Sequence, residues 1–157
     1  MDLTHIHLLL NHFPIVGTLI GGIVMLWGMA KHQKNLKTGA AAIVIAMTIM
    51  AIPVFLTGEP AEERVEHLPG ISESMVEEHE EAGELAIWVM VAAGVASLAA
   101  LVLQNKSSSK LAFTLATFLT LLAFAAMARA GYYGGQIRHT ELQTDQQASQ
   151  QAGILDE

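Results

Sequence analysis

The sequence predicts an all-α integral membrane protein: an up-down bundle of four membrane-spanning helices with one extra short amphipathic helix on its outer side. Three observations predict this class. Hydrophobic residues make up 52% of the 157 residues. Charged residues make up only 15%, against about 25% in ordinary soluble domains. The apolar residues are gathered in four long runs, and a helix needs about 20 such residues to cross a bilayer.

The four predicted spans follow one another within a single membrane domain, residues 1–140. They cover about residues 8–29, 39–56, 85–103 and 111–130. The connectors after the first and third spans are short, so the spans that they join are expected to pack as antiparallel neighbours. Residues 141–157 form a polar, glutamine-rich C-terminal tail.

The segment 57–84, between the second and third spans, is predicted to lie outside the membrane. Pro60 fits the first turn of a short helix whose apolar side can rest on the membrane surface. Ser74 and Glu77 fit a capping box, which would start the third helix before it enters the lipid. After the fourth span, the glycine-rich stretch Gly131–Gly135 predicts a break in the chain.

Charge is divided between the two sides of this predicted bundle. The two short connectors hold five lysines and no acid, whereas all fifteen acids lie in the other extramembrane parts, and the net charge is −7. The positive-inside rule therefore places both termini and the segment 57–84 outside. We expect a multi-pass protein of the bacterial inner membrane with periplasmic termini. The acidic balance excludes nucleic acid as a partner.

Six of the seven histidines fall on the predicted outer side. His12 lies in apolar sequence near the outer end of the first span, where a polar side chain usually has a partner and a function. His79 lies on the outer extension of the third helix, and His139 follows the fourth. His7 and His5 precede the first span and are further candidates. Facing helices of a bundle commonly build cofactor or metal sites in this way.

Two kinds of site can use these histidines. A b-type haem needs two imidazoles, an apolar slot and cations for its propionates, and Arg129 and Arg138 are cations at the correct end. Copper or zinc would be held by three or four outer histidines together with Glu80. The absence of cysteine excludes thiolate zinc sites and cysteine-ligated iron–sulfur clusters. No di-iron, zinc-protease or serine-hydrolase motif is present, so we expect an electron carrier or accessory subunit rather than an enzyme.

Gly17 and Gly21 in the first span allow close approach of another helix. Two interpretations remain open at this point. The glycines serve packing inside one bundle, or they form the seam of a homodimer.

Three stretches resemble a family of bacterial four-helix inner-membrane proteins that is catalogued as a domain of unknown function. They are H-F-P at His12–Pro14, T-G-x-x-A-E at Thr57–Glu62 and E-E-H-E at Glu77–Glu80. Some members are joined to Rieske-type iron–sulfur domains or lie near respiratory genes, which implies electron transfer and has led to proposals of haem binding. The resemblance points first to His12 and His79. This chain has no Rieske half, so such a redox partner would be a separate polypeptide.

The favoured hypothesis is therefore a membrane b-type cytochrome-like electron carrier. The first alternative is an outward-facing copper- or zinc-binding protein. The second is a non-catalytic structural subunit of a respiratory complex, in which the histidines are merely interfacial.

Overall fold

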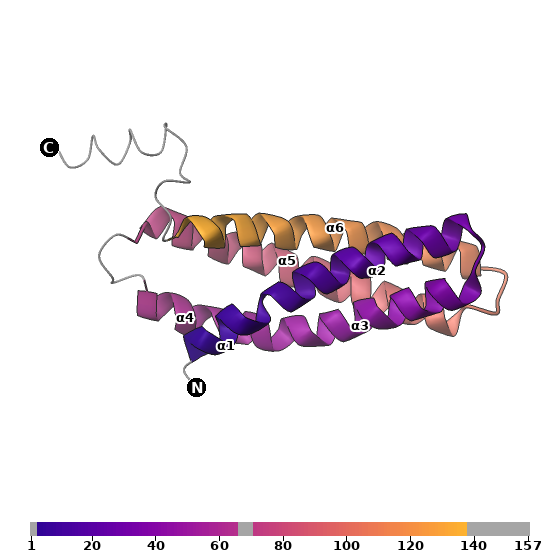
Figure 1. The fold of residues 1–157 in the computed structure, drawn as a ribbon, viewed down its shortest axis with the longest axis horizontal. Coiled ribbons are helices and arrows are strands. Elements are labelled where there is room, and N and C mark those ends of the chain that lie inside the picture. Colours follow the sequence, from indigo (N-terminus) through magenta and orange to yellow (C-terminus); the bar gives the residue numbers. More distant parts are fainter. Residues whose placement is uncertain (1–2, 66–70, 138–157) are drawn as a thin grey trace, which may run out of the picture.

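The computed structural model describes residues 3–65 and 71–137, and every regular element within these residues is an α-helix. The predicted all-α class is confirmed. The described helices form four passes that are long and apolar enough to cross a membrane. Consecutive passes run in opposite directions along the long axis of the bundle (Figure 1). Arg138, His139 and the tail 141–157 lie outside the described residues.

The first pass consists of two helices, α1 (Leu3–Leu10) and α2 (His12–Ala30), which meet at Asn11. Pro14 explains the break, because it has no N–H to donate to the carbonyl of Leu10 and its ring crowds the preceding turn. The sequence predicted a single span here. The structure adds α1 as a separate short helix at the end of the bundle that is predicted to face outward, which is called the outer end below.

The second pass contains α3 (Lys34–Leu56) and α4 (Gly58–Val65). The predicted short outer helix is α4, which begins at Gly58. Thr57 joins the two helices, and its hydroxyl donates to the carbonyl of Pro53 at 2.8 Å. The same carbonyl also accepts the backbone N–H of Thr57 at 3.1 Å, so two groups of Thr57 hold the last turn of α3. In Figure 1, α4 lies beside α1 at the outer end of the bundle.

The third pass is α5 (Glu73–Val102), which extends well beyond the predicted span at its N-terminal end. The predicted capping box at Ser74 is wrong. Ser72 is the N-cap residue, because its backbone is extended (φ −93°, ψ 110°) while Glu73 is already helical. The carbonyl of Ser72 then accepts the backbone N–H of Val76 at 3.2 Å, the first helical hydrogen bond.

The fourth pass is α6 (Ser109–Gln136), and it continues through the glycines that were predicted to break it. A glycine costs a helix interior only about 1 kcal/mol relative to alanine, so packing against other helices can maintain the helix. This continuation matters for the site, because it places Gly134 in the last turn of α6.

The turn after α2 joins the first two passes at the opposite end of the bundle, which is called the inner end below. His32 has a positive φ of 55°. The N–H of Gln33 donates to the carbonyl of Gly28 at 2.8 Å, and the N–H of His32 donates to that of Met29 at 3.2 Å. This is a Schellman motif, which reverses the chain and satisfies the last carbonyls of α2.

Glycines bring α2 and α3 close together. A Cβ on Gly21 would lie 3.0 Å from Cγ2 of Val44, and a Cβ on Gly17 would collide with the side chain of Met47. Both glycines therefore face α3 inside the bundle. These contacts are those of packing inside one bundle, the first of the two interpretations, and they give no support to a homodimer seam.

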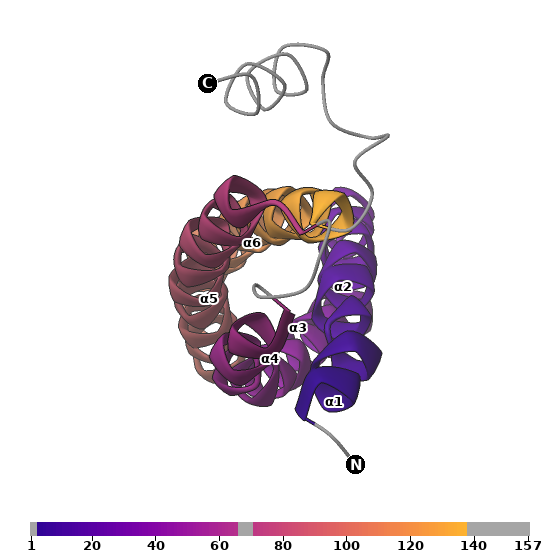
Figure 2. The same ribbon diagram turned by 90° about the vertical axis from the view of Figure 1, so that its left-hand side faces the viewer.

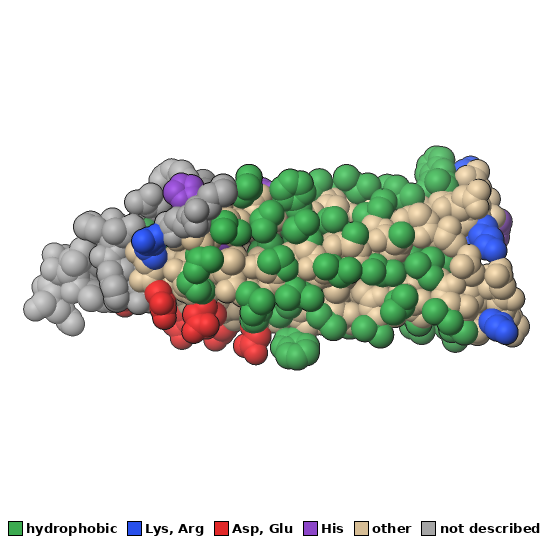
Figure 3. All heavy atoms as spheres, turned by 90° about the horizontal axis from the view of Figure 1, so that it is seen from below, with side chains coloured by type: hydrophobic (Ala, Val, Ile, Leu, Met, Phe, Trp, Pro, Cys, Tyr) green, Lys and Arg blue, Asp and Glu red, His purple; other side chains and the backbone are tan. Residues whose placement is uncertain are grey.

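The lateral surface of the bundle, which surrounds its long axis, is apolar along most of its length. Figure 3 shows hydrophobic side chains over the middle, acidic side chains near the α1 and α4 end, and lysines or arginines at the opposite end. Large side chains such as Trp27, Trp88 and Phe118 are 59%, 66% and 63% exposed. Such a surface is compatible with contact with a lipid bilayer.

Candidate functional site

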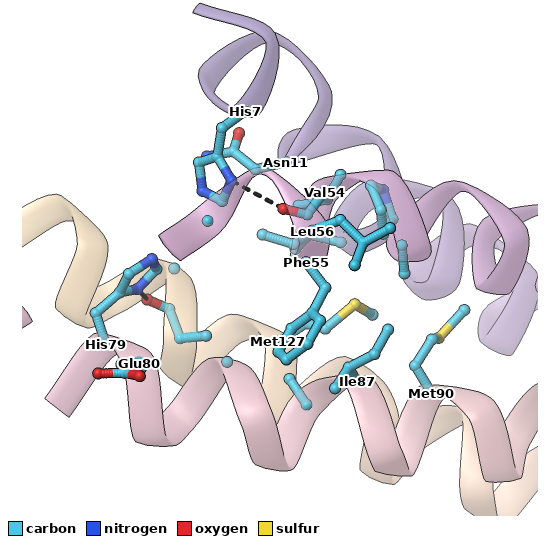
Figure 4. A pocket seen from close by; sticks show the side chains of 18 of the residues that line it. His7, Asn11, Val54, Phe55, Leu56, His79, Glu80, Ile87, Met90 and Met127 are labelled. Atoms are coloured by element: carbon cyan, nitrogen blue, oxygen red, sulfur yellow. Dashed lines mark hydrogen bonds between the residues drawn. The ribbon is translucent and has the colours of Figure 1, made fainter. Parts of the chain in front are cut away.

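A pocket of about 250 Å³ opens at the outer end of the bundle (Figure 4). Viewed from this end, the four long helices surround a common axis (Figure 2). The wall is mainly apolar, with Phe55, Ile87, Met90 and Met127 among its larger side chains. Its polar side chains, here called the polar rim, are those of His7, Asn11, Glu59, Glu62, His79 and Glu80. An apolar cavity with a few convergent polar groups is the usual form of a ligand or cofactor site.

His7 enters the pocket from α1. Its Nδ1 lies 3.0 Å from the backbone carbonyl oxygen of Val54 in the last turn of α3. A carbonyl can only accept a hydrogen bond, so Nδ1 carries the proton in this arrangement. The open carbonyls at the end of α3 thus fix the tautomer and the direction of the His7 ring.

His79 enters the same pocket from α5 and is held in the same way. Its Nδ1 lies 2.8 Å from the carbonyl oxygen of Ala130 on α6. Nδ1 is again the donor, so Nε2 carries the lone pair in the neutral imidazole. In both histidines, Nε2 is therefore the atom left to bind a ligand.

The two imidazoles face the same end of the pocket from opposite sides (Figure 4). Their ring centroids are 6.4 Å apart, and their planes are nearly perpendicular at 89°. Glu62 of α4 completes this group, because its Oε1 lies 3.9 Å from Nε2 of His79. The structure thus brings together residues from α1, α4 and α5 that are far apart in the sequence.

His12, the first-ranked candidate from the sequence, does not line the pocket and is exposed at the start of α2. His7 belongs to α1 and His12 to α2, and the break at Asn11 separates the two helices. The structure therefore brings His7, and not His12, to His79. His5 is also exposed and does not line the pocket, whereas Glu80 does.

Arg129, the predicted partner of the haem propionates, also lies away from the pocket lining. Its Nη2 is 3.5 Å from Oε2 of Glu78, and its guanidinium lies 5.3 Å from the centroid of the Tyr133 ring. Its side chain is 50% exposed. Arg138 and His139, the other candidates at this end, lie outside the described residues.

The predicted copper or zinc site needs at least three ligands. Within residues 3–65 and 71–137, no group of three or more histidine, cysteine, aspartate or glutamate side chains is placed to hold a metal ion. The described part of the chain instead supplies a pair of imidazoles with one carboxylate nearby.

Sequence reasoning missed three contributors to the site: Glu62, the carbonyls that orient the histidines, and Gly134. The backbone carbonyls carry no sequence signal. Glu62 is one of many acids in its segment, so nothing in the sequence singles it out. Gly134 belongs to the glycine-rich stretch in which the sequence predicted a break. Only the continuation of α6 through this stretch places Gly134 beside His79.

Comparison with known proteins found no matching family model, curated protein or solved structure. The resemblance described from the sequence remains a prediction.

Proposed function

We propose that this protein is a membrane electron carrier that holds a b-type haem between His7 and His79. One observation carries the proposal. Two imidazoles from different passes share one pocket, and each donates its Nδ1 proton to the main chain of a neighbouring helix. Histidines that bind metals commonly donate their other ring N–H to a carbonyl or carboxylate, because this bond fixes the ring and makes it a better ligand.

The spacing of the rings supports two ligands to one iron. Metal–imidazole bonds are about 2 Å long, so two rings bound on opposite sides of one ion have centroids about 6 Å apart. The observed separation is 6.4 Å. Haem needs only two such ligands from the protein, which is the number that the described residues provide.

The walls also suit a flat group. Gly83 lines the pocket, and a Cβ there would meet no atom within 4 Å. Ala51, Ala86 and Ala130 line it as well. Small residues leave the space between the passes open without placing polar groups in it. A haem held here would supply one-electron transfer, while the helices would orient it and exclude water.

A second candidate function is supported by the charge of the polar rim. Its charged side chains are the acids Glu59, Glu62 and Glu80, and no lysine or arginine among the described residues lines the pocket. Acidic side chains do not favour haem propionates, but they do favour a divalent cation. Copper or zinc bound by His7 and His79 is therefore the alternative. Its third ligand would be Glu62 after a movement of that side chain, or a residue outside the described part of the chain.

The distribution of charge supports an orientation for either function. Five lysines lie in or next to the connectors at one end, and the acids among the described residues lie toward the end with the pocket. By the positive-inside rule, the pocket would open on the outer side of a bacterial inner membrane. A respiratory or Rieske-type protein outside the membrane is the partner that an electron carrier in this position would serve. The structural-subunit alternative requires no ligand in the pocket.

The test is the absorption spectrum of the full-length protein, purified without a histidine tag from cells supplied with haem. We expect a Soret band that shifts on reduction with dithionite. His7→Ala and His79→Ala should each weaken haem binding at least 100-fold, whereas His12→Ala should bind as the wild type does. His12 is the matched control because it is the same residue type, close in sequence and outside the pocket.

Elemental analysis of the same preparations separates the candidates. If the wild-type protein contains stoichiometric copper or zinc and shows no Soret band, and if His79→Ala loses the metal, the metal site is supported in place of the haem site. Neither haem nor metal in the wild-type protein would reject both and leave the structural subunit.

A further inference from the structure

We infer that Gly134 is a positioning residue for His79. Its missing side chain leaves the space in which the His79 imidazole reaches the carbonyl of Ala130, and this contact directs Nε2 of His79 into the pocket. The effect of Gly134 on ligand binding rests on the proposed function. The effect of Gly134 on the position of the His79 ring does not depend on it.

The contact is built on the helical repeat of α6. Gly134 is four residues after Ala130, so its N–H is the helical partner of the Ala130 carbonyl. His79 donates to the same oxygen at 2.8 Å. The imidazole must therefore lie directly against the backbone at Gly134.

A side chain at this position would meet the ring. A Cβ on Gly134 would lie 3.0 Å from Cε1 and 3.1 Å from Nδ1 of His79, both closer than the 3.5–4.0 Å of good van der Waals contact. The ring cannot move away freely, because moving it lengthens or bends the hydrogen bond to Ala130. Alanine at position 134 must then change either that bond or the direction of Nε2.

His7 is not constrained in this way. The nearest glycine is Gly58, where a Cβ would lie 3.6 Å from Cε1 of His7, which is an ordinary contact. The two imidazoles therefore differ: His79 needs a glycine beside it and His7 does not.

Gly135 provides the matched control. It is the next residue in α6, it is exposed, and a Cβ there would meet no atom within 4 Å. Gly134→Ala and Gly135→Ala change the helix propensity of the same turn equally, so any difference between them reports the contact with His79.

The experiment compares these two variants and Gly58→Ala in the full-length protein in detergent. The first measurement is the ¹⁵N spectrum of the imidazoles without added haem. We expect the His79 signals to move in Gly134→Ala and to stay in place in the other two variants. The second measurement is a haem titration, in which Gly134→Ala should bind about 10-fold more weakly, as is usual when the support of a metal ligand is disturbed.

Equal His79 spectra in Gly134→Ala and Gly135→Ala would overturn the inference. If the wild-type protein binds no haem but the His79 signals still move in Gly134→Ala, the positioning role stands and the proposed function fails. If the His79 signals stay in place in Gly134→Ala, and haem binds to wild type and to this variant with the same affinity and the same reduced spectrum, the inference fails and the proposed function stands.

Discussion

The two ends of the bundle are built differently, although the same four passes form both. Toward the lysine-rich inner end, the large side chains of Met25 and Phe113 are 0% and 1% exposed. Toward the outer end, Gly83 and Ala86 line the pocket, and the passes leave open space between them. Toward the inner end the side chains interdigitate closely, whereas at the outer end the small residues Gly83 and Ala86 form part of the wall around open space. Substitutions at the two ends should therefore affect different properties.

The largest effect is expected from removing a core side chain near the inner end. Met25→Ala should lower the free energy of unfolding by about 2–5 kcal/mol, because it leaves a cavity in close-packed surroundings. Met127→Ala is the comparison at the outer end. Met127 borders space that already exists, so its truncation should cost clearly less. Unfolding in mixed micelles measures both, and equal losses would contradict the contrast between the two ends.

An intermediate effect is expected from filling the pocket. Gly83→Phe places a large ring where a Cβ meets no atom within 4 Å, so it should weaken haem binding at least 10-fold with little change in stability. Gly39→Phe is the control near the inner end, because a Cβ on Gly39 also meets no atom within 4 Å and Gly39 does not line the pocket. Haem titration and unfolding of both variants check this. If Gly83→Phe binds haem like Gly39→Phe, the ligand does not occupy this pocket.

The smallest effect is expected from adding only a methyl group at the same two positions. Gly39→Ala and Gly83→Ala should each stabilise the protein by about 0.4–1 kcal/mol, since alanine restricts the unfolded chain and favours a helix. Thermal unfolding of the two variants measures this. If Gly83→Ala lost stability and Gly39→Ala did not, glycine would be required at position 83 by the backbone conformation, and not by the volume that its missing side chain leaves in the pocket.

The overall fold could be predicted from the sequence, because the lengths of apolar runs and the placement of charges are local properties. The four passes and the short outer helix followed from them. The ends of helices were less predictable. The sequence alone did not show that α6 persists through its glycines, because the packing that compensates for their low helix propensity comes from other parts of the chain.

The candidate site was predicted only in part. The outer end and His79 followed from the positions of the histidines. The choice between His7 and His12 did not, because it depends on which face of the first pass meets α3 and α6. Apolar residues surround His12 in the sequence, yet it is exposed on the outer surface of the bundle. In a membrane protein the outer face is as apolar as the interior, so an apolar neighbourhood does not identify the interior.

The hydrogen bonds of the two histidines have one further consequence. His7 ties α1 to α3, and His79 ties α5 to α6, so each imidazole belongs to one hairpin of the chain. A ligand bound to both would join the two hairpins at their open end. Because it binds only the folded arrangement, it would make the loaded protein harder to unfold than the empty one. A cell could then remove chains that never received their ligand simply through their faster proteolysis.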